Sequence, residues 1–218
     1  MEKRLFVLFM LISLTTGLFG CSYHSNGTVT TSNEGVDVNY SLTGIPILLG
    51  ASGSSVPIAH NVSITAAHVA KYSYDKVIAY HPTCDIALVY SDNSDKVIPQ
   101  AGYVYPNQYI LNIGRSVLGS LVKSEGKYLI DYHFENYYPG CFTSISTAAL
   151  QSGMSGGGAY NESRQLVGIN FAIIKHVNTD DESYAMVNEA ERRSAFVALP
   201  FISEWVKLET GIVLYASE

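Results

Sequence analysis

The sequence predicts an all-β protein that ends in a single amphipathic helix. Short apolar or alternating runs recur from residue 45 onward, and Gly, Asn, Asp or Pro interrupts most of them, which is typical of a β-sandwich or β-barrel. The 16 tyrosines and the many Val, Ile and Thr residues favour strands as well. Apolar residues make up 47% of the 218 residues, enough for one large domain or two small halves that share a cleft.

The expected strands follow one another along most of the chain. They are Ile45–Leu49, Val56–Ala59, Val62–Thr65, Lys76–Tyr80, Ile86–Tyr90, Tyr109–Ile113, Ser116–Val122, Tyr128–His133, Leu166–Ile174 and Ala195–Leu199.

Helical periodicity is confined to two segments. The first is a single turn around Ala66–Ala70. The second is Pro200–Leu208, where four apolar residues share one face. This second helix begins at a proline and is followed by Gly211, which are typical start and stop signals.

The first residues have the pattern of an export signal. Lys3 and Arg4 precede an apolar run that ends in small residues, and the run is short for a helix that spans a bilayer. We therefore expect residues 1–20 to be a signal peptide. Leu18-Phe19-Gly20-Cys21 resembles a bacterial lipobox, in which the cysteine is acylated and becomes the first mature residue. The alternative is an ordinary secretory signal that is cut elsewhere.

The lipobox resemblance implies an exported protein of the cell envelope, anchored to a membrane by a lipid on Cys21. Ser22 follows the cysteine. The absence of Asp at this position favours the outer membrane, or the periplasm more broadly, if the cell is Gram-negative. Residues 21–40 are rich in Ser, Thr, Asn and Gly, so we expect a flexible tether between the anchor and the folded body.

Charge and composition exclude several kinds of partner. The net charge is −6, and no run of Lys or Arg follows the first few residues, which argues against a nucleic-acid partner. No cluster of residues has the spacing of metal ligands, and no phosphate-binding loop precedes a helix. We expect no metal and no cofactor.

The most informative motif is the stretch from Gly153 to Gly158, which holds Ser155 among glycines. A serine hydroxyl becomes a good nucleophile only when its backbone is fixed and a base lies nearby. Glycines allow a sharp turn and leave backbone N–H groups exposed to an oxyanion. A flexible Gly/Ser loop is the alternative interpretation.

Two further segments complete a pattern together with Ser155. Thr65-Ala66-Ala67-His68 ends one strand, and Asp85-Ile86-Ala87-Leu88 opens another. With Gly153-Met154-Ser155-Gly156-Gly157 and Leu166-Val167-Gly168-Ile169, these motifs stand in the order His, Asp, Ser. In all of them the chain resembles the trypsin-like (chymotrypsin-fold) serine proteases.

The resemblance implies a specific fold, two six-stranded antiparallel β-barrels and a C-terminal α-helix, with the active cleft between the barrels. It covers a domain of residues 41–212, with the first barrel at about 41–98, the second at about 99–199 and the helix at about 200–210. The interval between His68 and Asp85 is short for this family. It leaves room for one connecting strand, so we expect a trimmed first barrel.

The resemblance also implies a serine endopeptidase that forms an acyl-enzyme intermediate. Ser155 would attack a peptide carbonyl, His68 would accept and later return the proton, and Asp85 would orient the imidazole. The amides of Gly153 and Ser155 would bind the oxyanion. Animal members carry an aspartate where Met154 stands, and it pairs with a new N-terminus after cleavage. We therefore expect this site to form without such cleavage.

The substrate pocket and one disulfide are implied by the same resemblance. The pocket residues would be Ala149, Leu150, Ser152, Asn170, Phe171 and Ala172. Because Ala149 at the pocket floor is uncharged, we expect small or apolar P1 residues. Cys84 and Cys141 would both border the cleft, so a Cys84–Cys141 bridge would join the two barrels.

Two other functions fit the same residues. The first is a catalytically silent surface lipoprotein that keeps the protease fold and binds a partner. The second is an esterase or a self-processing enzyme with the same three side chains. The expected partners are a protein or peptide substrate and, through the lipid on Cys21, a membrane.

Overall fold

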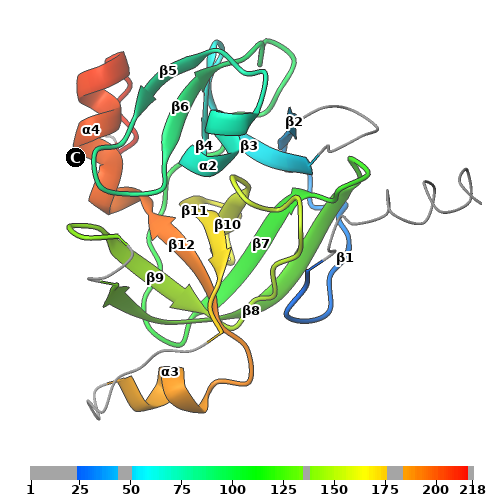
Figure 1. Cartoon of the computed structure of the whole chain (residues 1–218), viewed down its shortest axis with the longest axis vertical. Coiled ribbons are helices and arrows are strands. Elements are labelled where there is room, and N and C mark those ends of the chain that lie inside the picture. Colours follow the sequence, from blue (N-terminus) through cyan, green and yellow to red (C-terminus); the bar gives the residue numbers. More distant parts are fainter. Residues whose placement is uncertain (1–23, 44–50, 135–137, 176–183, 216–218) are drawn as a thin grey trace, which may run out of the picture.

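The alternating runs of the sequence form two antiparallel β-structures that lie against each other (Figure 1). The computed structural model describes residues 24–43, 51–134, 138–175 and 184–215. The expected signal peptide, Cys21 and the expected strand Ile45–Leu49 lie outside these residues. None of the helices within the described ranges is both long enough and apolar enough to cross a membrane.

The first half of the chain is a five-stranded sheet. Its strands are β2 (Asn39–Thr43), β3 (Ala51–Ala59), β4 (Val62–Thr65), β6 (Ala87–Tyr90) and β5 (Val77–Tyr80), in that spatial order. Within the part of the chain that the structure describes, β2 and β5 are edge strands, and no pairing closes the sheet into a barrel. The short interval between His68 and Asp85 holds one connecting strand, β5, as expected.

The second half forms the closed six-stranded antiparallel barrel that the sequence predicts. Its strands are β8 (Leu121–His133), β7 (Tyr109–Arg115), β10 (Gly158–Tyr160), β11 (Leu166–Ile173), β12 (Ser194–Ala198) and β9 (Phe142–Ser146), and β9 pairs back with β8. The expected strand Ser116–Val122 is wrong over its first five residues. They form a tight turn in which Ser116 and Ser120 are hydrogen-bonded and Gly119 has a φ of 85°.

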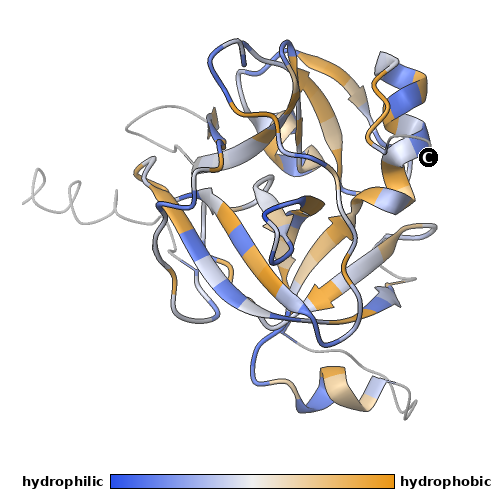
Figure 2. Ribbon diagram, turned by 180° about the vertical axis from the view of Figure 1, so that it is seen from behind, coloured by the Kyte–Doolittle hydropathy of each residue, from blue (hydrophilic) through white to orange (hydrophobic). Residues whose placement is uncertain are grey.

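One apolar cluster lies on one side of strand β7, and a second, on its other side, spans both halves of the fold. Alternate residues of β7 point to opposite sides, so Ile110 packs in a cluster with Phe196, whereas Leu111 packs in a second cluster. This second cluster continues into the first sheet through Ile64 and Leu88, both fully buried. Figure 2 shows the hydrophobic residues concentrated in the strands. Burial of each such side chain stabilises the fold by roughly 1.5–3 kcal/mol.

The C-terminal helix α4 (Leu199–Thr210) matches the expected helix closely. Pro200 lies in its first turn, and Gly211 ends it in the left-handed conformation with a φ of 74°, donating to Lys207 O. Its apolar face, with Ile202 and Val206 fully buried, belongs to the core shared by the two halves. Two shorter helices, α2 (Ala67–Tyr72) and α3 (Ala185–Glu189), complete the structure.

The expected flexible tether at residues 21–40 needs correction over its described part, residues 24–40. The strand β1 (Thr30–Thr31) pairs with β8, and the Glu34 carboxylate accepts hydrogen bonds from Lys123 and Arg164. These bonds hold the pKa of Glu34 below its ordinary value. The polar side chains that are typical of a linker also supply hydrogen bonds: Asn26 Nδ2 donates to Arg193 O in the second barrel, and Asn39 Nδ2 donates to Ser63 Oγ in the first sheet.

One disulfide joins the two halves. Cys84 lies before β6 of the first sheet and Cys141 lies before β9 of the second barrel, and their Cα atoms are 5.1 Å apart. The expected bridge is therefore present. Next to it, Thr83 Oγ1 donates a 3.1 Å hydrogen bond to Gly140 O across the same junction.

Removal of this bridge should destabilise the protein strongly. It closes a loop between residues 57 positions apart, for which chain entropy predicts about 4 kcal/mol of stabilisation. We expect the double variant Cys84→Ala/Cys141→Ala to lose roughly this much in urea denaturation, and reductant to have the same effect on the wild type. Reductant should not change the double variant, which controls for Cys21. An unchanged denaturation midpoint would contradict this prediction.

Candidate active site

His68 and Asp85 are held together by two hydrogen bonds. Strand β4 ends at Thr65, and His68 lies in the first turn of α2. Its Nδ1 donates to Asp85 Oδ2 at 2.6 Å, and its backbone N–H donates to Asp85 Oδ1 at 2.9 Å. The Asp85 side chain is only 10% exposed, whereas that of His68 is 44% exposed. Because a carboxylate only accepts, the proton of the neutral ring lies on Nδ1, and Nε2 remains as an acceptor.

A second histidine, His81, shapes the turn that precedes Asp85. Its Nδ1 accepts hydrogen bonds from the amides of Cys84 at 3.0 Å and Thr83 at 3.3 Å. Its ring contacts the Trp205 ring of α4 at a centroid distance of 4.9 Å. Burial lowers the pKa of His81, which favours the neutral ring that this acceptor role requires. Sequence reasoning missed this role because His81 has no motif around it.

Glycines bend the chain on both sides of Ser155. Gly153 has a φ of 96° and Gly156 a φ of 82°, conformations that other residues rarely adopt. Between them Met154 is fully buried in an apolar cluster with Val122 and Leu150. Packing therefore fixes the position that carries an ion pair in animal members of the fold.

Strand β3 fastens this nucleophile loop to the first sheet. The amide of Ser54 donates to Ser155 O at 2.8 Å, and the Ser54 hydroxyl donates to Gly153 O at 2.7 Å. Ser54 O in turn accepts from Thr65 Oγ1 at 2.6 Å. A Cβ at Gly156 would overlap both Ser54 O and Thr65 Oγ1. The loop therefore lies directly against the strand that leads to His68.

The Ser155 hydroxyl is directed at a different acceptor from His68. It donates to Phe171 O at 3.4 Å, and within the described residues no hydrogen bond joins it to His68. The amides of Gly153 and Ser155 have no hydrogen-bond acceptor in the described part of the chain. Ser155 thus combines a half-buried hydroxyl with two unpaired amide donors next to it.

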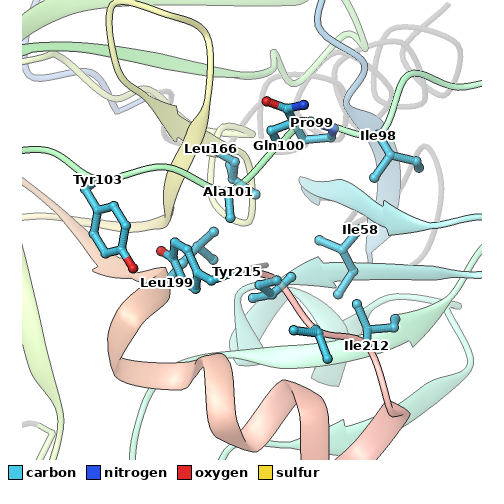
Figure 3. Close-up of a pocket in the computed structure, with 12 residues that line it drawn as sticks. Ile58, Ile98, Pro99, Gln100, Ala101, Tyr103, Leu166, Leu199, Ile212 and Tyr215 are labelled. Carbon is cyan, nitrogen blue, oxygen red and sulfur yellow. The ribbon is translucent and has the colours of Figure 1, made fainter. Parts of the chain in front are cut away.

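The six residues expected to line the substrate pocket differ in exposure. Ser152 and Ala172 are half-buried. The other four are at most 4% exposed: Ala149, Leu150, Asn170 and Phe171. A cavity of about 580 Å³ lies elsewhere, between Ile58, Leu199, Ile212 and their neighbours, and none of the His68, Asp85 or Ser155 side chains lines it (Figure 3).

An aromatic pair lies beside Asp85 that the motifs do not predict. The rings of Tyr138 and Phe171 meet edge to face with centroids 5.2 Å apart. Burial, and then the nearby negative charge of Asp85, raise the pKa of Tyr138. The sequence contains one signal for this position: Tyr138 lies three residues before Cys141, whose bridge partner is next to Asp85.

Comparison with known proteins identifies the fold of this chain through solved structures, not through sequence. No family model matches the sequence, and neither does any curated protein sequence. The HtrA-type protease AlgW, solved with a tripeptide, superposes with a TM-score of 0.65 at 17% identity over 81% of this chain. The chain has the trypsin-like fold.

A second structure supports the same fold. The Rv3671c protease from M. tuberculosis, in its active form, gives a TM-score of 0.62 at 16% identity and covers 84% of both chains. The chain spans only 62% of the length of AlgW. At these identities the trypsin-like fold is what the comparisons establish.

Protonation of His81 should lower stability below neutral pH. The pKa of folded His81 lies below 6.5, the value expected when it is unfolded. As pH falls, the unfolded chain therefore takes up the His81 proton before the folded chain does. The contribution of neutral His81 to the free energy of unfolding is present above pH 6.5 and is lost as pH falls through the lower pKa of the folded state. We expect His81→Asn to remove this step from urea denaturation measured between pH 7.5 and 5. The exposed His60→Asn is the control, and equal pH dependence in wild type and His81→Asn would contradict the prediction.

Loss of the Ser54 hydroxyl should loosen the nucleophile loop. This hydroxyl accepts from the Arg115 amide and donates to Gly153 O in a fully buried site. Ser54→Ala leaves both partners unpaired, so we expect a loss of about 1–3 kcal/mol in the free energy of unfolding. Ser55→Ala, an adjacent buried serine, is the matched control and should change stability less. Equal effects of the two substitutions would argue against this role of Ser54.

Proposed function

We propose that this chain is a serine endopeptidase, with Ser155 as nucleophile, His68 as general base and acid, and Asp85 as the residue that orients His68. The observation that carries the proposal is the double hydrogen bond from His68 to Asp85, which leaves Nε2 free to accept a proton. The fastening of the Ser155 loop by Ser54 supports it, since the Ser54 carbonyl accepts from Thr65 at the end of the strand that leads to His68.

The proposed reaction has two stages. The Ser155 hydroxyl turns from Phe171 O to His68 Nε2, gives up its proton there and attacks the peptide carbonyl carbon. The amides of Gly153 and Ser155 stabilise the resulting oxyanion, a contribution of several kcal/mol in such sites. The His68 proton then passes to the leaving amine. Water repeats the same steps on the acyl-enzyme and releases the acid.

Peptides are the proposed substrates. The fold neighbour AlgW was solved with a tripeptide and with a decapeptide, and in the described part of this chain the amides of Gly153 and Ser155 have no hydrogen-bond acceptor. The buried and uncharged Ala149 favours small or apolar P1 residues over Lys and Arg. The proposed setting is the cell envelope, with the chain exported and anchored through a lipid on Cys21.

Covalent labelling tests this proposal. We expect a fluorophosphonate to label the wild type, Ser155→Ala to abolish labelling and Ser163→Ala, an exposed serine on another loop, to preserve it.

Asp85→Asn should lower kcat for peptide hydrolysis by about 10⁴-fold, because the wrong ring tautomer then faces Ser155. A folded protein that neither labels nor hydrolyses would favour the silent binding protein. Cleavage of esters without cleavage of peptides would favour the esterase.

A further inference from the structure

The N-terminal strap, which we define as His24–Gly27, runs antiparallel to the segment just before the nucleophile loop. The Asn26 amide donates to Leu150 O at 3.2 Å, and the Ser152 amide donates to His24 O at 2.8 Å. Between them Ser25 pairs with Gln151. The strap therefore adds a short ladder to residues 150–152, which belong to no strand of the barrel.

The side chain of Asn26 connects two parts of the second barrel. Its Oδ1 accepts from the Leu150 amide at 2.8 Å. Its Nδ2 donates to Arg193 O and to Ser194 Oγ, each at 3.0 Å. The Asn26 side chain thus accepts a hydrogen bond from the segment before Gly153 and donates two hydrogen bonds at the start of β12.

Close packing seats the strap firmly. A Cβ at Gly27 would lie 2.6 Å from Arg192 Cδ and 3.1 Å from Ala149 Cβ, so glycine is the residue that fits there without displacing a neighbour. The His24 amide also donates to Ser152 Oγ at 2.9 Å. Backbone and side-chain contacts therefore fix the strap from both of its ends.

The segment that the strap supports leads directly to the proposed oxyanion amides. The barrel holds its beginning, where Asn112 Nδ2 and Ser124 Oγ donate to Ala148 O and Ala149 O. The amides of Leu150 and Ser152, in contrast, donate to the strap. Gly153 follows at once, so the orientation of its amide depends on how well residues 150–152 are held.

We propose that Asn26 is a positioning residue for catalysis, and that the strap sets the amide of Gly153 for the oxyanion. This inference rests on the proposed function. Asn26 acts through Leu150 and Ser194 and does not touch the reacting atoms. The uncharged and buried Met154 cannot form an ion pair that supports the nucleophile loop. The strap supports this loop by hydrogen bonds instead.

Kinetics of Asn26→Ala test the proposal. We expect kcat for a peptide substrate to fall by about 10- to 100-fold, approaching the effect of losing one oxyanion donor. The affinity for a peptide aldehyde, whose adduct with Ser155 carries an oxyanion, should fall by the same factor. Binding of the uncleaved peptide to the Ser155→Ala chain should change by a smaller factor than kcat when Asn26→Ala is added, because the strap acts chiefly on the oxyanion amide.

Two further variants keep the test decisive. Glu34→Gln is the matched control, since Glu34 fastens the same N-terminal segment to Lys123 and Arg164 rather than to residues 150–152. It should leave kcat unchanged. If Asn26→Ala does not fold, Ser194→Ala removes one of its partners and should lower kcat by a smaller factor. A folded Asn26→Ala with wild-type kcat, or an equal loss in Glu34→Gln, would overturn the proposal.

Hydrogen exchange separates this inference from the proposed function. We expect the amides of Leu150 and Ser152 to lose protection in Asn26→Ala and to keep it in Glu34→Gln, whether or not the protein is an enzyme. If Asn26→Ala loses this protection while the wild-type chain is not labelled at Ser155, only the proposed function fails. Unchanged protection in Asn26→Ala would mean that the strap does not support this segment.

Discussion

The architecture of the site depends on a single serine, Ser54, which links the two halves of the fold. Its amide and hydroxyl bind Ser155 O and Gly153 O, and its own carbonyl accepts from Thr65. A glycine-rich loop has little conformational preference of its own, so its shape is imposed by such contacts. The absence of a Cβ at Gly156 lets the loop approach this closely. The separation between the loop and the His68 strand is thus set by backbone contact.

Three other constraints act at the same junction. The disulfide lies beside Asp85, the His81 ring accepts from the turn before Asp85, and α4 contributes Trp205 to that ring. The disulfide and the His81–Trp205 contact join residues far apart in the sequence, whereas the bonds from Thr83 and Cys84 to His81 are local, and all of them hold the segment that leads into Asp85. Asp85 is thereby held without help from a long loop between it and His68. Among the described strands no pairing closes the first sheet around this residue, and the second half supports it through the disulfide.

The sequence predicted the parts of this structure that depend on local pattern. Alternation located most strands, and the proline and glycine flanking α4 located the helix, because both signals act within a few residues. The turn at Ser116–Ser120 was missed because Val117 and Leu118 stand close to Leu121 and Val122, so the whole segment was taken as one apolar run. The described tether residues were misjudged because a segment rich in Ser, Thr and Asn has the same composition whether its polar groups bond to water or to the rest of the protein.

The residues of the site also fall into those that local motifs predict and those that they do not. Short motifs drew attention to His68, Asp85 and Ser155, and the structure pairs the first two. The roles of Ser54, His81, Tyr138 and Asn26 arise from contacts between segments that no local pattern marks. Burial of Ala149 and Phe171 was likewise unpredictable, since it results from packing of the completed barrel.

The position of the strap has a mechanical consequence. Only three peptide units separate Cys21 from His24, a reach of at most about 11 Å. A lipid on Cys21 would therefore hold the folded body within roughly a nanometre of the bilayer. Any tension on that anchor would pull first on the residues that pair with Leu150–Ser152. Force at the membrane surface would then be transmitted to the loop that carries Ser155 before it reached the rest of the barrel.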